Sequence, residues 1–473
     1  MLSSQDFRKY AHQIADRMAD YFEHIEQYSP KSQVSPQQIL EALPMHAPEQ
    51  PETMEAILQD FDTIIMQGIT HWQHPSFFAY FPANNSYASV LAEMLTATLG
   101  AQCMVWDTSP AAAELEERMM QWIKQAMQLP QHWEGVIQDT ASTATLCALL
   151  TAREQYSQYA INERGFENDK LTVYCSNQTH SSIEKAVKIA GIGKKQLRYI
   201  ATDEQFAIRI DSLEEAIRKD LAEGYTPLVV VGNIGTTGST AVDPIDAMGE
   251  ICKKYHIFFH VDAAYAGSAA LLPEKQSFFK GLEHADSYVF NPHKWLMTNF
   301  DCTAYFVKSK EALIRTFEIL PEYLKTQHDQ KVNNYRDWGI QLGRRFRALK
   351  LWFVWRSFGV EGLQKTLRTH LALAQTLYQR ISTHSDFEIL APMHFNLVCF
   401  RYKPTNINNE ETLNLLNAQL LERLNQSGKV YLSHTKLNGK YTLRVVVGQT
   451  NVNQTHIDQL WELLLHHKQV LSN

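Results

Sequence analysis

The sequence predicts an α/β fold whose large domain is built on a mainly parallel sheet. Short apolar runs recur between about 135 and 307, for example at 171–175, 227–232 and 257–261, and each is short enough to be a buried strand. Helical patterns separate them, as at 244–254, and a repeated strand–helix–strand order favours parallel strands joined by right-handed crossovers. Because ligands of such sheets bind beyond the carboxyl ends of the strands, residues at those ends are the candidates for binding and catalysis.

Two of these strand ends carry residues suited to a cofactor. Asp262 ends the run 257–261, and Lys294 follows the run 288–290 in the segment NPHKW. This pair suits pyridoxal phosphate, because the lysine amine would form a Schiff base with the aldehyde while the aspartate keeps the pyridine nitrogen protonated. Taken alone, an acid and a lysine at strand ends are more often solvated charges, so the wider context has to decide.

Composition narrows the class of protein. The chain has 473 residues, 45% of them hydrophobic, which is ample for a large core and two or three domains. A net charge of −7 argues against nucleic-acid binding. Six scattered cysteines without a CxxC spacing predict reduced thiols, no metal site and a cytoplasmic protein. Neither a secretory signal nor a run of membrane-spanning length is visible, so no membrane partner is expected.

Longer motifs around Asp262 and Lys294 resemble the group II pyridoxal-phosphate decarboxylases, and most of all their aromatic-L-amino-acid branch. They extend over most of the chain: HPSFFAYFP at 74–82, SPAAAELE at 109–116, NQTHSS at 177–182, HVDAAY at 260–265, NPHKW at 291–295 and LGRRFRALKLWFVWRSFGVEGLQ at 342–364.

The resemblance implies an architecture. It is that of a fold type I pyridoxal-phosphate enzyme, with a helical N-terminal segment (1–84), a large cofactor-binding α/β domain (85–368) and a small C-terminal α+β domain (369–473). In the resembled family the N-terminal segment lies across a second subunit. We therefore expect a homodimer with active sites at the subunit interface.

The same resemblance assigns catalytic roles. Lys294 and Asp262 hold the two ends of the cofactor, and His180 stacks on the pyridine ring, where it can donate to the substrate carboxylate. Tyr323, in a polar lid at 321–338, would return a proton to the substrate's α-carbon after carbon dioxide leaves.

The predicted phosphate site is the start of the helix that follows the strand at 135–138. Free N–H groups at a helix N-terminus attract a phosphate, although an ordinary helix cap uses the same residue types. Asp139 stands where many relatives have glycine, so its carboxylate would have to point away from the phosphate. The predicted cofactor-binding residues are Thr140, Ala141, Ser142, His180, Thr237, Asp262, Ala264, Asn291, His293 and Lys294.

The predicted substrate pocket is aromatic, and its family-matched residues are Trp72, Tyr80, Phe81, Pro82, Met104 and Gly343. Three positions depart from the animal enzymes. Ala83 replaces a small hydroxyl residue, and Gln102 and Met104 stand where apolar and aromatic residues are usual.

The expected activity is decarboxylation of an L-amino acid of the tryptophan, tyrosine, phenylalanine or DOPA type to its amine. Histidine or acidic amino acid decarboxylases, and an aminotransferase of the same fold, are alternatives within the class. An aromatic aldehyde synthase is another, although such enzymes usually replace the lid tyrosine that Tyr323 retains. A catalytically silent binding protein would be expected to lose Lys294 or Asp262, and both are present.

Overall fold

The computed structural model describes residues 2–319 and 331–472 of the chain. Its internal packing forms two compact units, the first made of 1–82, 373–388 and 400–473 and the second of 83–372 and 389–399. The three-part division expected from the sequence stays a prediction.

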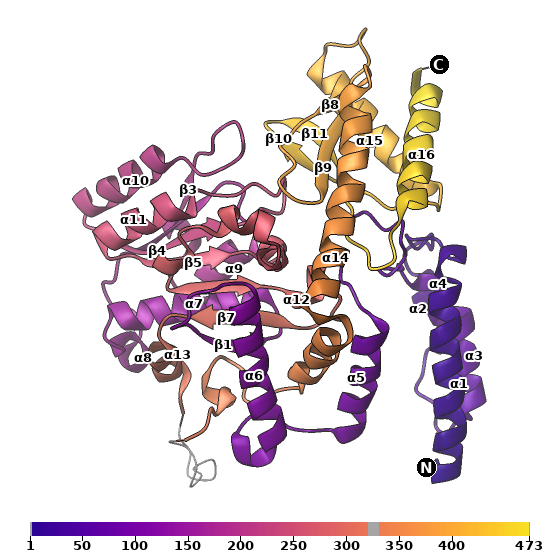
Figure 1. Cartoon of the computed structure of the whole chain (residues 1–473), viewed down its shortest axis with the longest axis horizontal. Coiled ribbons are helices and arrows are strands. Elements are labelled where there is room, and N and C mark those ends of the chain that lie inside the picture. Colours follow the sequence, from indigo (N-terminus) through magenta and orange to yellow (C-terminus); the bar gives the residue numbers. More distant parts are fainter. Residues whose placement is uncertain (1, 320–330, 473) are drawn as a thin grey trace. The chain divides into compact units, whose positions relative to one another are not determined.

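The second unit is built on a seven-stranded sheet with the strand order β1-β7-β6-β5-β4-β2-β3 (Figure 1). Its strands are β1 (Glu134–Gln138), β2 (Leu171–Ser176), β3 (Leu197–Ile200), β4 (Thr226–Asn233), β5 (Phe258–Asp262), β6 (Ser287–Phe290) and β7 (Thr303–Val307). Strand β7 is antiparallel to both of its neighbours, whereas β3, β2, β4, β5 and β6 pair in parallel. The predicted mainly parallel α/β fold is therefore confirmed.

Helices cover this sheet on both faces, with α10 and α11 on one side and α7, α8 and α13 on the other (Figure 1). The helices of the unit are α5 (Tyr87–Leu99), α6 (Pro110–Ala126), α7 (Ala141–Tyr156), α8 (Ala160–Arg164), α9 (Ser182–Ile189), α10 (Ile210–Ala222), α11 (Ile245–Tyr255), α12 (Pro292–Trp295) and α13 (Lys310–Phe317). The strands β2, β5, β6 and β7 are buried almost throughout, as their valine- and aromatic-rich sequences predict.

The first unit combines N-terminal helices with a small α+β part. Its helices are α1 (Ser4–Glu23), α2 (Gln38–Ala42), α3 (Met54–Asp60), α4 (Met66–Gly68), α15 (Glu410–Gln426) and α16 (Gln454–Ser472). A four-stranded sheet has the order β10-β11-β9-β8, with strands β8 (Phe387–Ile389), β9 (Leu397–Tyr402), β10 (Ser433–Leu437) and β11 (Lys440–Val446). β10 and β11 form an antiparallel hairpin whose turn residues, Asn438 and Gly439, both have positive φ, as the tight turns favoured in hairpins require.

Helix α14 (Arg347–Thr383) runs from the second unit into the first. It is interrupted at Gly359, whose φ of 64° is not helical. The break divides α14 into one helical part before Gly359 and another after it. None of the helices in the described ranges combines the length and apolarity that crossing a membrane requires.

Candidate functional site

The centre of the candidate site lies where the parallel strands β5 and β6 end side by side. Asp262 is the last residue of β5, and it pairs with Val289 of β6. The two loops that follow are hydrogen-bonded to each other, since the Asn291 N–H donates to the Ala264 carbonyl at 3.0 Å. The short helix α12 then begins, and it carries Lys294. The fold thus brings together an acid and a lysine that are far apart in the sequence.

The Asp262 carboxylate is nearly buried, with 8% of the residue exposed. Its Oδ1 accepts the Ala264 N–H at 2.9 Å, which fixes the side chain against its own loop. Lys294 is partly buried, and burial lowers the pKa of its amine, while the negative charge of Asp262 opposes that lowering. A lowered pKa leaves more of the amine uncharged, and the uncharged amine is the nucleophile that attacks an aldehyde.

His180 follows β2 and belongs to the same group of charges. The pKa of its imidazole is lowered, chiefly by desolvation; the charge of Asp262 opposes this and that of Lys294 adds to it. The ring is oriented by the Ser182 hydroxyl, 2.9 Å from Nδ1, and by the Ser182 N–H, which donates to Nδ1 at 3.1 Å. The structure therefore places His180 within electrostatic reach of both members of the central pair.

A buried carboxylate that the sequence did not single out supports this region. Asp243 accepts the backbone N–H groups of Ile208 and Asn233, each at 2.8 Å. The Asn233 amide in turn donates to Asp243 and to Thr179, both at 2.9 Å, and Thr179 directly precedes His180. Burial raises the pKa of Asp243 to about 6. This network joins the ends of β2 and β4, which are adjacent strands.

The turn after β4 holds Thr237, which is exposed to solvent. Gly235 shapes this turn: its φ is +88°, and a Cβ added to it would lie 2.5 Å from the Cβ of Ala266. A residue with a side chain would therefore be strained here by both the backbone conformation and the contact.

The predicted phosphate site begins with Thr140, the N-cap of α7, whose hydroxyl accepts the Thr143 N–H. In the first turn of α7, the N–H groups of Ala141 and Ser142 have no acceptor among the described residues, and Ser142 is exposed. Two backbone donors and a hydroxyl at a helix N-terminus form a donor set that fits a phosphate. Asp139 departs from the expectation, because its carboxylate faces this turn and accepts the Thr140 N–H at 2.5 Å.

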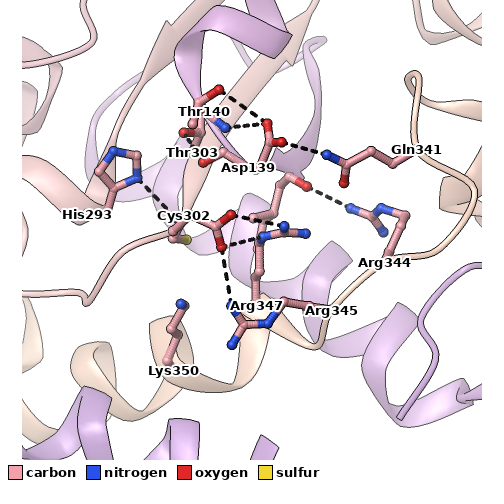
Figure 2. A network of polar contacts seen from close by, with 12 residues as sticks. Asp139, Thr140, His293, Cys302, Thr303, Gln341, Arg344, Arg345, Arg347 and Lys350 are labelled. Carbon is pink, nitrogen blue, oxygen red and sulfur yellow. Dashed lines mark hydrogen bonds and ion pairs between the residues drawn. The ribbon is translucent and has the colours of Figure 1, made fainter. Parts of the chain in front are cut away.

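Thr303, at the start of β7, lies beside Asp139 (Figure 2) and also contacts Asn291, which precedes the helix that carries Lys294. Its hydroxyl lies 3.0 Å from the Asp139 carbonyl oxygen and 2.8 Å from the Asn291 Oδ1. Because Oδ1 of Asn291 accepts this bond, its Nδ2 remains as a donor, and that group has no acceptor in the described part of the protein. Asn291 thereby adds a further donor suited to a phosphate.

His293 is buried beside Lys294, and its Nδ1 accepts the Cys302 N–H at 3.0 Å (Figure 2). The backbone N–H of His293 donates in return to the backbone carbonyl of Cys302 at 3.3 Å. Desolvation lowers the pKa of His293 to about 3, so the ring is neutral at physiological pH. These contacts tie α12 to the segment that precedes β7, and the predicted contact of His293 with the cofactor stays a prediction.

The predicted substrate residues fall in both units. Trp72, Tyr80, Phe81 and Pro82 belong to the first unit, where the rings of Trp72 and Tyr80 stack with their centroids 5.8 Å apart. Tyr80 has a φ of 52°, and its hydroxyl lies 3.2 Å from that of Tyr431. Tyr431 is 351 residues from Tyr80, so only the folded chain reveals this contact.

Met104 and Gly343 belong to the second unit, in segments that hydrogen-bond to each other. The Gln102 side chain accepts the Arg344 N–H at 2.7 Å, and the Met104 carbonyl accepts the Arg336 N–H at 2.9 Å. A Cβ added at Gly343 would lie 3.3 Å from the Gln102 Nε2. Gln102 therefore borders the space that Gly343 leaves open. Tyr323 lies outside the described residues.

A lysine and an aspartate at neighbouring strand ends, a histidine near both and a donor-rich helix N-terminus form a set of groups that fits pyridoxal phosphate. Comparison with known proteins agrees. The model of the pyridoxal-dependent decarboxylase conserved domain matches residues 36–403. The chain therefore belongs to the pyridoxal-dependent decarboxylases, enzymes whose cofactor is pyridoxal 5′-phosphate.

Individual relatives cover nearly the whole chain. Tyrosine decarboxylase 4 of Petroselinum crispum is 43% identical, over 99% of this chain and 94% of its own length. Phenylacetaldehyde synthase of Arabidopsis thaliana is also 43% identical, over 98% of this chain and 96% of its own. Among solved structures, that of Oryza sativa TDC with PLP and tryptamine has a TM-score of 0.96 at 34% identity, covering 100% of this chain and 99% of that one.

Proposed function

We propose that this protein decarboxylates aromatic L-amino acids of the tryptophan, tyrosine, phenylalanine or DOPA type to the corresponding amines and carbon dioxide. The observation that carries the proposal is the meeting of Asp262 and Lys294 at the ends of adjacent strands, in a chain that belongs to the decarboxylase family. The relatives named for tyrosine decarboxylation and the structure that contains tryptamine favour an aromatic substrate.

Each member of the central group has a role that follows from its surroundings. Bound pyridoxal phosphate supplies a ring that takes up the electron pair released when carbon dioxide departs. Lys294 would hold the aldehyde, because the lowered pKa of its amine leaves more of it in the uncharged, nucleophilic form. Asp262, held by the Ala264 N–H, would accept a hydrogen bond from the ring nitrogen and keep it protonated.

The remaining roles concern the phosphate, the substrate and the final proton. Ala141, Ser142 and Asn291 provide donors to the phosphate, with Thr140, Thr237, Ala264 and His293 lining the rest of the cofactor site. His180 would help to hold the cofactor ring and would orient the substrate carboxylate. Tyr323 donates a proton to the α-carbon, which completes the amine.

We further propose that substrate contacts come from Trp72, Tyr80, Phe81, Pro82, Met104 and Gly343. The aromatic rings of Trp72, Tyr80 and Phe81, and the absence of a side chain at Gly343, suit a substrate with a flat aromatic side chain. The protein is proposed to act as a homodimer, because α5 exposes a row of large apolar side chains. A cytoplasmic location is supported by its six free, buried cysteines.

The placement of the cofactor is tested by trapping it. Protein loaded with pyridoxal phosphate is treated with borohydride, digested and analysed by mass spectrometry. We expect the cofactor mass on the peptide containing Lys294, no trapped cofactor in Lys294→Ala and normal trapping in the control Lys308→Ala, whose lysine is half-exposed. Trapping that survives Lys294→Ala would contradict the proposed site.

The substrate and product class are decided by a panel of amino acids. Aromatic aldehyde synthesis is the second candidate, because phenylacetaldehyde synthase is as similar to this chain as tyrosine decarboxylase. Both reactions release carbon dioxide, but decarboxylation gives the amine without consuming oxygen, whereas the synthase reaction consumes oxygen and water and releases aldehyde, ammonia and hydrogen peroxide. We expect amine from tryptophan, tyrosine, phenylalanine or DOPA with no oxygen uptake. Turnover of histidine or glutamate alone would exclude the aromatic assignment.

A further inference from the structure

Asp139 places a negative charge at the N-terminus of α7, where the phosphate donors lie. The residue follows β1 directly and is partly buried. Its Oδ1 accepts the Thr140 N–H at 2.5 Å, and its Oδ2 accepts the Gln341 Nε2 at 2.6 Å (Figure 2). The Thr140 hydroxyl also donates to Oδ1 at 3.3 Å, so turning the side chain away would break three hydrogen bonds.

This arrangement opposes phosphate binding in two ways. First, the Thr140 N–H is given to the carboxylate, which removes one donor from the first turn of α7 and leaves those of Ala141 and Ser142. Second, a carboxylate close to a phosphate raises the electrostatic energy of the bound phosphate, and partial burial reduces the screening by water. The helix dipole attracts both the carboxylate and the phosphate to the N-terminus of α7, so each anion reduces the electrostatic stabilisation that the other gains there.

We propose that Asp139 weakens the hold of α7 on the cofactor's phosphate and thereby keeps the cofactor exchangeable. The inference rests on the proposed placement of the phosphate at Thr140–Ser142. It predicts that the enzyme's saturation depends on the concentration of free pyridoxal phosphate, and that this dependence is set by the charge of one side chain.

The test compares pyridoxal phosphate with pyridoxal, which has the same ring and aldehyde but no phosphate. Apoprotein is titrated with each compound, and the affinity is taken from the visible absorbance of the lysine adduct and from the borohydride-trapped fraction. Asp139→Asn is the main variant, because its amide oxygen can still accept the Thr140 N–H while the charge is lost. The contact with Gln341 is kept if the Gln341 amide turns, so that its oxygen accepts from the new asparagine Nδ2. Asp139→Glu keeps the charge, and Asp139→Ser is a smaller neutral second variant; the thermal unfolding midpoint of each apoprotein confirms folding.

We expect Asp139→Asn and Asp139→Ser to bind pyridoxal phosphate about ten-fold more tightly or better than the natural protein, with a slower release of the cofactor. Asp139→Glu should stay within about two-fold of the natural affinity, and the affinity for pyridoxal should be unchanged in all three variants. Neutral variants with unaltered pyridoxal phosphate affinity, or with equal changes for both compounds, would overturn the inference. If the inference about Asp139 fails but borohydride trapping still requires Lys294, the proposed cofactor site stands. If trapping persists in Lys294→Ala, the proposed cofactor site and the inference about Asp139 both fail.

Discussion

At the scale of single residues, His293, on the helix that carries Lys294, makes the free energy of unfolding depend on pH. Its ring accepts a backbone N–H and is buried, and its pKa lies near 3 against an ordinary value of 6.5. Between these values the unfolded chain binds a proton that the folded protein does not. The contribution of His293 to the free energy of unfolding is therefore fully present above pH 6.5, and it is lost as the pH falls toward 3.

We predict that His293→Asn weakens this pH dependence. The asparagine Oδ1 can replace Nδ1 as acceptor for the Cys302 N–H but does not titrate. Between pH 6 and 4.5, the free energy of unfolding of the natural apoprotein should fall by up to about 1.4 kcal/mol more per pH unit than that of the variant. Urea unfolding at several pH values measures the difference.

The control for this prediction is His132→Asn, because His132 is exposed. It should retain the natural slope of unfolding free energy against pH. Equal slopes for the natural protein and His293→Asn would show that His293 is not the titrating group. Other buried histidines, such as His260, contribute equally in all three proteins and cancel in the comparison.

The central residues could be predicted from the sequence because their signals are local. Asp262 and Lys294 each follow a short apolar strand, and each lies in a motif of the family. Tyr431, Gln341 and Thr303 carry no such signal, since each contacts its partner through the tertiary fold alone. Such polar residues come to lie beside the site only when the chain folds, and the periodicity of the sequence does not predict these contacts.

At the scale of elements, the turn after β4 depends on Gly235. The positive φ there disfavours any side chain, and the contact with Ala266 leaves no room for one. Because this turn precedes Thr237 and faces the loop that follows Asp262, a shift in it disturbs the cofactor site as well as the fold.

We predict that Gly235→Ala lowers the free energy of unfolding by about 2–4 kcal/mol, the sum of backbone strain and overpacking. Gly439→Ala is the matched control, because Gly439 also has a positive φ of 79° but nothing within 4 Å of an added Cβ. It should lose only about 1–2 kcal/mol. Denaturant unfolding of both apoproteins measures the two losses of unfolding free energy. Equal losses would mean that the contact with Ala266 does not destabilise Gly235→Ala.

Elements were predicted best where burial makes the pattern strong. The strands β2, β4 and β5 appear as continuous apolar runs, and the structure confirms them. The sequence does not predict strand β3, since it is a short edge strand of four residues that is buried only at its two ends. The reversed direction of β7 was also not predicted, because strand direction depends on how the chain connects and not on residue periodicity.

At the scale of the whole molecule, helix α5 of the second unit exposes a row of large side chains. Tyr87, Leu91, Leu95 and Leu99 recur along α5 at intervals of four residues, and between 48% and 64% of each is exposed. Four large apolar side chains along one face of a helix are costly in water, and a contiguous patch of this kind commonly marks a protein–protein interface.

We predict that the protein is a homodimer in which α5 is buried, and that Leu91→Glu with Leu95→Glu converts it to a monomer. Two charges placed in an apolar interface lose hydration without gaining partners, which costs several kcal/mol for each subunit. Sedimentation at micromolar concentration measures the mass. The control Leu415→Glu alters a leucine on α15 that is 62% exposed, and it should leave the dimer intact. A natural protein that sediments as a monomer, or a double variant that stays dimeric, would remove α5 from the interface and leave its exposed leucines without an explanation in the assembly.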